Sequence, residues 1–227
     1  METKAFSELF PLFGTANPQT IAAILAAVDK HEYPSDRTVL MEDAWGNAVY
    51  FVASGWVKVR RLYKDEVFTI AIMGPGDFFG EMAILDESPR STDVVALSPV
   101  ELLSVSAQSF IQILFKDAEL HHRLLQLMVK RLRQTNFRFQ QLHQKPPIKL
   151  LNSLISLAET YGKATVDGTE IYNIPYPDLA DVADISIEDT TSILEKLQER
   201  GWLKIDEARQ VLCITNIQQL SQLVAKA

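Results

Sequence analysis

The chain of 227 residues lacks several features that define common classes of protein. It holds one cysteine, Cys213, so it forms no intramolecular disulfide and cannot supply the thiolates that iron–sulfur clusters usually need. Its four histidines show no HExxH spacing and no cluster with cysteine, so we expect no metal site. No apolar run approaches the roughly 20 residues of a membrane helix, and the N-terminus lacks a secretory pattern. We therefore expect a cytoplasmic protein.

Positive charge is also scarce, since 22 Lys and Arg stand against 29 Asp and Glu and give a net charge of −7. That balance disfavours a nonspecific nucleic-acid binder, which is usually basic, but it is compatible with a local basic face. No nucleophile–base pair, phosphate-binding glycine loop or metal constellation is visible in the sequence. We therefore expect a protein that is not an enzyme.

The first half of the chain changes from helical to β-rich texture. Asn17-Pro18 offers a cap and a first-turn proline for a helix within the first 30 or so residues. From about Tyr33 to Val105, short β-rich runs alternate with turn signals such as Gly74-Pro75-Gly76. These runs are Thr38–Met41, Ala48–Val52, Trp56–Leu62, Val67–Met73, Val94–Ala96 and Glu101–Val105. Short, regularly spaced strands predict an antiparallel barrel or sandwich.

Helix is predicted again at Ala107–Phe115 and from Ala118 to about Leu142. The longer helix carries a seam of residues at intervals of three and four, which is the a/d spacing of a coiled coil. The seam residues are Leu125, Met128, Leu132, Thr135, Phe139 and Leu142. A second apolar set lies on a different face and consists of Leu120, Leu124 and Leu127. We expect this second face to pack on the β-rich domain and the seam to pair with a second copy; a single buried helix is the alternative.

A proline pair, Pro146-Pro147, breaks this helix and marks a hinge before a smaller domain. The elements predicted there are helices at Ile148–Tyr161, Pro177–Ala183 and Ile187–Arg200, and a hairpin of Trp202–Ile205 with Gln210–Ile214. Helix, turn, helix and hairpin form the winged helix-turn-helix pattern. The sequence thus predicts three parts: residues 1–117 with the β-rich domain, 118–145 with the long helix and hinge, and 146–227 with the winged helix.

The segment Gly74–Ala83, which reads GPGDFFGEMA, is followed by SPRST at Ser88–Thr92. This pattern resembles the CRP/FNR family of bacterial effector-responsive regulators, and the resemblance covers nearly the whole chain. It implies an α+β fold with an N-terminal cyclic-nucleotide-binding β-roll, a long dimerisation helix and a C-terminal winged helix-turn-helix. It also implies a homodimer that reads a small effector and binds operator DNA. The finer texture is similar to cyanobacterial members, and some CRP-like proteins respond to cyclic-di-GMP instead of cAMP.

The residues of this segment suit a cyclic phosphate. Gly80 lets the backbone approach a ligand closely, and Glu81 can accept a hydrogen bond from a ribose 2′-hydroxyl. Arg90 can hold phosphate by a bidentate fork, and Ser91 and Thr92 can add donors. By the family pattern, Glu81, Arg90 and Ser91 match the cAMP-binding positions. The alternative is that Glu81 and Arg90 pair with each other in a roll that holds no nucleotide.

Two further sets of residues bear on the base of the nucleotide. The family pattern matches Thr135 and Asn136 to positions that touch adenine across the dimer. Arg60 and Arg61 crowd one strand, and Asp93 follows the SPRST segment. An arginine can contact guanine O6 and N7, and an aspartate can accept from guanine N1 and N2. These charges favour cyclic-di-GMP slightly over cAMP, and a solvated strand face is the alternative.

The DNA-reading helix departs from the family pattern, which has an arginine, an adjacent glutamate and a second arginine. The matching residues are Ile187, Glu188 and Ser192, so only the glutamate agrees. The candidate contact residues of the helix are Ile187, Glu188, Thr190, Thr191, Ser192 and Lys196. From Asp178 to Glu195 there are six acids and no Lys, Arg or His, and acids repel DNA phosphates. The alternative to a DNA-binding regulator is therefore a cyclic-nucleotide adaptor that acts through another regulator protein.

Overall fold

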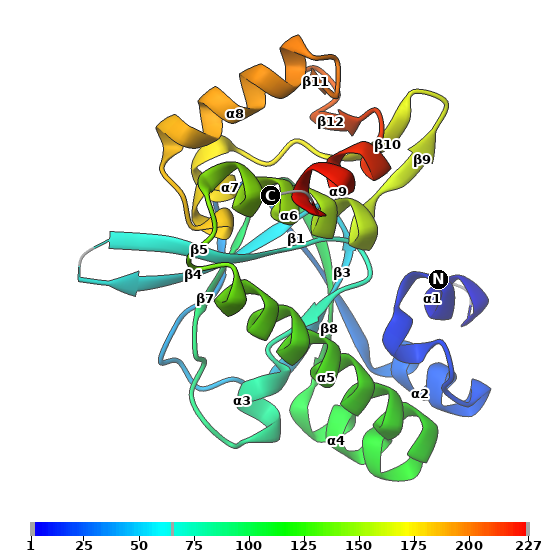
Figure 1. The fold of residues 1–227 in the computed structure, drawn as a ribbon. Coiled ribbons are helices and arrows are strands. Elements are labelled where there is room, and N and C mark those ends of the chain that lie inside the picture. Colours follow the sequence, from blue (N-terminus) through cyan, green and yellow to red (C-terminus); the bar gives the residue numbers. More distant parts are fainter. Residues whose placement is uncertain (1–2, 65, 226–227) are drawn as a thin grey trace. The chain divides into compact units, whose positions relative to one another are not determined.

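The structure is a computed structural model that describes residues 3–64 and 66–225. The chain divides into two compact units, Met1–Asn136 and Phe137–Ala227 (Figure 1). The boundary between them lies inside the segment 118–145 that the sequence sets apart as helix and hinge. The three-part division stays a prediction, and its ends at residues 1–2 and 226–227 lie outside the described residues.

The N-terminal unit combines helices with two four-stranded sheets. Its helices are α1 (Thr3–Leu9), the 3₁₀ helix η1 (Pro11–Phe13), α2 (Pro18–Ala27), α3 (Glu81–Leu85), α4 (Ala107–Lys116) and α5 (Ala118–Gln140), the last of which continues past the unit boundary. Its strands are β1 (Val28–Tyr33), β2 (Thr38–Leu40), β3 (Ala48–Ser54), β4 (Val57–Tyr63), β5 (Glu66–Met73), β6 (Phe78–Phe79), β7 (Asp93–Ala96) and β8 (Val100–Ser106).

The two sheets are antiparallel and have the strand orders β1-β8-β3-β6 and β2-β7-β4-β5. Together they form the β-roll that the resemblance implies. Strand β1 was not predicted, because three of its six residues are charged and its apolar alternation is weak. Strand β6 and helix α3 were not predicted, because two and five residues are too few to show a period.

Strand β3 explains how the unit builds two cores, because successive side chains of a strand point to opposite faces. Phe51 packs with Phe10 and Phe13 of the N-terminal helices, with ring centroids 5.5 and 5.4 Å away. Val52 faces the other cluster, which fills the space between the sheets. Leu120 and Leu124 of α5 are buried in the helical core, and Leu127 packs against it. The prediction that this face of the long helix packs on the β-rich domain is confirmed.

The C-terminal unit has the predicted winged helix-turn-helix. Its elements are α6 (Pro146–Tyr161), β9 (Lys163–Thr165), β10 (Gly168–Tyr172), α7 (Tyr176–Ala183), α8 (Ile187–Glu199), β11 (Leu203–Asp206), β12 (Val211–Ile214) and α9 (Ile217–Ala225). The wing hairpin joins a four-stranded sheet of order β11-β12-β10-β9, in which β9 and β10 were not predicted; nor was α9. Ser186 caps α8, since its side chain accepts a hydrogen bond from the Asp189 amide at 3.0 Å.

Candidate functional site

The predicted phosphate-binding segment runs from β6 through α3 to β7. Gly80 has a φ of +83° and is the N-cap of α3, so the turn places Glu81 in the first turn of that helix. Glycine adopts this left-handed backbone without the steric cost that other residues meet. The hydroxyls of Ser91 and Thr92 make no hydrogen bond with the described residues, and Ser91 is exposed. These two side chains are therefore available to a ligand.

Arg90 is a buried cation without an acidic partner. It is 5% exposed, yet it forms no ion pair within the described residues. Its guanidinium donates to the carbonyl of Gly80 and, at 2.7 Å, to the carbonyl of Ala48. Burial lowers the pKa of the Arg90 guanidinium, while nearby Tyr50 and Glu81 raise it. Carbonyls neutralise no charge, so the remaining donors suit an anion.

Two glycines make room for this guanidinium. A Cβ added at Gly46 would lie 2.1 Å from the Arg90 Cζ atom, and one at Gly80 would lie 2.6 Å from an Arg90 Nη atom. Both distances are far below van der Waals contact. Gly46 and Gly80 therefore fix where the Arg90 side chain lies.

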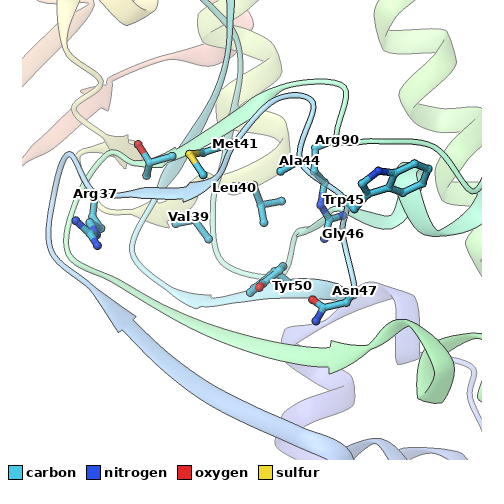
Figure 2. A pocket seen from close by; sticks show the side chains of 11 residues that line it. Arg37, Val39, Leu40, Met41, Ala44, Trp45, Gly46, Asn47, Tyr50 and Arg90 are labelled. Atoms are coloured by element: carbon cyan, nitrogen blue, oxygen red, sulfur yellow. The ribbon is translucent and has the colours of Figure 1, made fainter.

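Arg90 lines a cavity of about 410 Å³ in the N-terminal unit. Trp45 lies beside Arg90 at one end of the cavity, and Arg37 lies at the other end (Figure 2). Val39 and Leu40 give the cavity an apolar wall between these ends. The volume lies within the range of small-molecule sites, which are mostly apolar with a few placed polar groups.

Glu81 pairs with the long helix and not with Arg90. An Arg131 nitrogen lies 2.6 Å from the Glu81 carboxylate, and a second one donates to the Phe78 carbonyl at 2.6 Å. The guanidinium also lies 4.3 Å from the centroid of the Phe78 ring. Burial raises the pKa of the Glu81 carboxyl above its ordinary value, and Arg131 and Arg90 oppose this rise. The alternative of a direct Glu81–Arg90 pair was wrong.

The structure does not bring Thr135 and Asn136 to the cavity within one chain. Both are exposed on α5, and the Thr135 hydroxyl donates to the Arg131 carbonyl at 3.1 Å. Their proposed contact with a base across a dimer stays a prediction.

The residues that favoured cyclic-di-GMP all form ion pairs. Arg60 lies 3.2 Å from the Asp93 carboxylate, which also accepts from the Glu42 amide at 2.8 Å. Arg61 lies 3.2 Å from the Glu42 carboxylate. None of these side chains lines the cavity that Arg90 faces. These contacts therefore favour the alternative interpretation, in which the charged residues form a solvated strand face.

One face of α5 exposes a row of apolar side chains. Leu125 is 55% exposed, Val129 51%, Leu132 60% and Phe139 64%. Met128, which was expected in this row, packs against the helical core instead, and Val129 takes its place. The spacing of four, three and seven keeps all four side chains on one face. Leu142, the last predicted member, follows the helix and is 48% exposed.

The DNA-reading helix α8 offers few cations. Ile187 is 49% exposed, and Glu188 and Lys196 are also exposed. Thr190 is fully buried and donates to the Ser186 carbonyl at 2.9 Å, so its expected contact with DNA or a partner is wrong. Thr191 and Ser192 are half-buried.

Three residues of the candidate site were not predicted from the sequence: Trp45, Gly46 and Arg131. Trp45 and Gly46 fall in a turn signal, and only the approach of Arg90 from a distant segment shows their role. Arg131 stands out in the sequence only as a basic residue beside the seam. Its pairing with Glu81 joins residues 50 positions apart and depends on the fold.

Comparison with known proteins agrees with this architecture. The family model for the cyclic nucleotide-binding domain matches residues 30–117. The CRP-like cAMP-activated global transcriptional regulator of Mycobacterium tuberculosis is 27% identical over 88% of this chain and 91% of its own length. The cyclic AMP receptor protein of Thermus thermophilus is 28% identical over 86% of this chain and 88% of its own. FixK2 of Bradyrhizobium japonicum shares the fold, with a TM-score of 0.75, 20% identity and coverage of 86% and 96%.

A cyclic nucleotide-binding β-roll followed by a winged helix-turn-helix defines a class of effector-responsive regulators. The resemblance to the CRP/FNR family is confirmed: residues 30–117 match the cyclic nucleotide-binding domain, and most of the chain is similar to CRP-like cyclic nucleotide-responsive transcription regulators. No helix within residues 3–64 and 66–225 is long and apolar enough to cross a membrane. Within the same residues, no group of three or more His, Cys, Asp or Glu side chains is placed to hold a metal ion.

Proposed function

We propose that this chain is a transcription regulator that binds the phosphate of a cyclic nucleotide at Arg90 and thereby changes its affinity for DNA. The observation that carries this proposal is the buried Arg90 guanidinium, which faces a cavity and has no acidic partner among the described residues. An unpaired buried charge is costly, and an anionic ligand removes that cost. Ser91 and Thr92 supply hydroxyls next to it.

Cyclic AMP is the nucleotide that the geometry favours. The case for cyclic-di-GMP rests on Arg60, Arg61 and Asp93, and binding it through them would require the Arg60–Asp93 and Arg61–Glu42 pairs to open. Two bacterial relatives that cover most of the chain are named for cAMP, while others of similar coverage are named global nitrogen regulators. Cyclic-di-GMP remains the second candidate, because these arginines are only partly buried and stay within reach of solvent.

Titration calorimetry with both nucleotides tests the proposal. We expect cAMP to bind and cyclic-di-GMP to bind more weakly, and we expect Arg60→Ala and Arg61→Ala to leave cAMP affinity within about twofold. Tighter binding of cyclic-di-GMP that is lost in the Arg60 and Arg61 variants would reverse the choice of ligand. Failure of the protein to bind any cyclic nucleotide would overturn the proposal itself.

We also propose that α5 holds a homodimer through its exposed apolar face. Each of the four exposed side chains would gain roughly 1.5–3 kcal/mol on full burial, which is enough to make a shared face favourable. In such a dimer two copies of α8 would meet successive major grooves of DNA. The adaptor alternative rests on the acidic surface of the C-terminal unit and on the apolar Ile187 at the start of α8. We do not favour it, because the Mycobacterium tuberculosis relative is named a transcriptional regulator.

A further inference from the structure

Trp45 is an exposed tryptophan at the cavity that Arg90 faces. It is 76% exposed, whereas Trp56 and Trp202 are half-buried. It lines the 410 Å³ cavity and also a groove of about 390 Å³ that contains residues of α3 and α4. An exposed indole keeps a large apolar surface in water, and covering that surface is favourable. The position therefore suits contact with a flat apolar group.

The folded chain fixes Trp45 relative to Arg90. The amide of Asp43 donates to the Arg90 carbonyl at 2.9 Å, and the amide of Arg90 donates to the Ala44 carbonyl at 2.9 Å. Gly46, the next residue after Trp45, packs against the Arg90 guanidinium. Figure 2 shows the indole next to the Arg90 side chain. A ligand held at the guanidinium therefore lies at the same cavity as the indole.

The remaining residues that line the cavity indicate which class of ligand it suits. Val39 and Leu40 are apolar, and the Tyr50 ring stacks on Phe79 with centroids 5.5 Å apart. A buried cation, an exposed indole and an apolar wall match a ligand that joins an anionic group to a flat ring. Nucleotides have this form, and their bases stack on aromatic side chains through their π faces.

We infer that Trp45 stacks on the purine ring of the nucleotide whose phosphate Arg90 binds, and that it selects purine nucleotides at this site. The inference rests on the proposed function. It assigns recognition of the base to the loop between β2 and β3 of the same chain. The family pattern assigns that contact to Thr135 and Asn136 of α5 instead.

The first test measures the affinity for cAMP by calorimetry. Trp45→Leu should weaken binding about tenfold, because leucine keeps an apolar surface but loses the stacking face. Trp45→Phe should keep affinity within about threefold, since a smaller ring still stacks. Phe115→Leu is the matched control: Phe115 is 81% exposed on α4 but lines neither hollow, so this variant should bind like the wild type.

The second test uses the base. Cytidine 3′,5′-cyclic phosphate has a smaller ring, so Trp45→Leu should weaken its binding less than it weakens the binding of cAMP. Cyclic AMP should also quench tryptophan emission of the wild type more than that of Trp45→Leu.

Two results would separate the failures. If Trp45→Leu binds cAMP within twofold of the wild type while Arg90→Ala has lost binding, the stacking inference is overturned and the proposed function stands. If the wild type binds no cyclic nucleotide, both are overturned.

Discussion

The basic side chain at the cavity of the N-terminal unit differs from several basic side chains of the C-terminal unit in how it is paired. At the cavity of the N-terminal unit, Arg90 is 5% exposed and has no acidic partner among the described residues. In the C-terminal unit, by contrast, four basic side chains contact groups of the unit itself. They are Arg138 on the Val182 carbonyl, Lys149 on Asp184, Lys204 on Asp167 and Arg209 on Glu170.

The comparison distinguishes two roles for a basic side chain: Arg90 is placed to bind an anionic ligand, whereas the paired cations of the C-terminal unit stabilise its fold. Lys149 shows the second role, since it contacts the Asp184 carboxylate at 2.6 Å and its carbonyl at 3.1 Å. Asp184 lies in the turn between α7 and α8 with a left-handed φ of +54°. A cation used in this way neutralises a neighbouring acid and contributes little to binding DNA phosphates. The candidate ligand site therefore keeps a cation without an acidic partner among the described residues, whereas these four cations of the C-terminal unit already contact its own groups.

The largest effect is expected when the unpaired cation at the cavity, Arg90, is removed. Arg90→Ala should weaken cAMP binding by about 30-fold or more, because losing a buried charge-assisted contact costs about 2–5 kcal/mol. Calorimetry measures the affinity, and Arg61→Ala, which removes the same charge from a partly exposed ion pair, is the control. Affinity within twofold of the wild type would show that the phosphate binds elsewhere.

The next effect concerns the proposed homodimer, which two copies of the chain would form through α5. Leu132 is 60% exposed on α5, and Leu132→Asp would place a charge on the apolar face of both copies. We expect monomers at micromolar concentration in analytical ultracentrifugation, since about 2–3 kcal/mol of burial per side chain is lost. Gln134→Asp, on the opposite side of the helix, should leave the dimer intact. A dimer that persists in Leu132→Asp would place the interface elsewhere.

A smaller effect is expected for DNA binding by the C-terminal unit, whose paired cations contribute little to it. The wild type should bind random duplex DNA weakly at about 50 mM salt and with a shallow salt slope, because few phosphates are neutralised. Ile187→Arg with Ser192→Arg should raise the affinity and steepen the slope by about 0.9 per added phosphate contact. Fluorescence anisotropy at several salt concentrations measures both quantities.

The control for this experiment adds the same charge away from α8. Gln218→Arg with Gln222→Arg places two arginines on exposed positions of α9 and should change the slope less. A steep slope in the wild type would contradict the comparison, because it would mean that many cations of the C-terminal unit reach phosphate.

The smallest effect contrasts a buried ion pair with an exposed one. Burial raises the pKa of the Glu81 carboxyl, so the folded protein binds a proton there more tightly than the unfolded chain does. Stability from this group is present below the ordinary glutamate pKa of about 4.3 and is lost as pH rises through the folded pKa. In urea denaturation, the wild type should therefore lose stability relative to Glu81→Gln over that window. Asp167→Asn is the control, because it opens an ion pair with both side chains more than 60% exposed, and such pairs contribute little to stability.

Helices and strands were predictable where neighbouring residues along the chain carry a clear apolar pattern. The strands from β2 onward that have apolar runs, the helices α4 to α8 and the wing were predicted within a few residues of their observed bounds. Strand β1 was missed because Asp29, Lys30 and Glu32 hide its pairing with β8, which lies about 70 residues away. Such a strand is recognised only by its partner.

The ligand site shows the same limit. Glycine, glutamate and arginine in the segment from Gly80 to Arg90 identify it, because one short stretch of chain carries all three. The partners of these residues come from elsewhere: Arg131 reaches Glu81 from α5, and Gly46 receives Arg90 on the loop before β3. Arg60 and Arg61 were interpreted as contacts for a guanine base, but in the structure they form ion pairs with Asp93 and Glu42. These pairs could not be predicted, because the sequence does not show which segments of opposite charge lie side by side in the fold.

Helix α5 has a consequence for exchanging parts between regulators. It runs from Ala118 to Gln140, so the boundary at Asn136 and Phe137 cuts a continuous helix and not a loop. Each helical N–H bonds the carbonyl four residues earlier, so residues on the two sides of that boundary share hydrogen bonds. A fragment that stops at Asn136 leaves its last turn without partners, and one that starts at Phe137 begins without a cap. A chimaeric gene should therefore be joined after Gln144, because the amides of Gln141 and Leu142 still donate to carbonyls of residues 137–139.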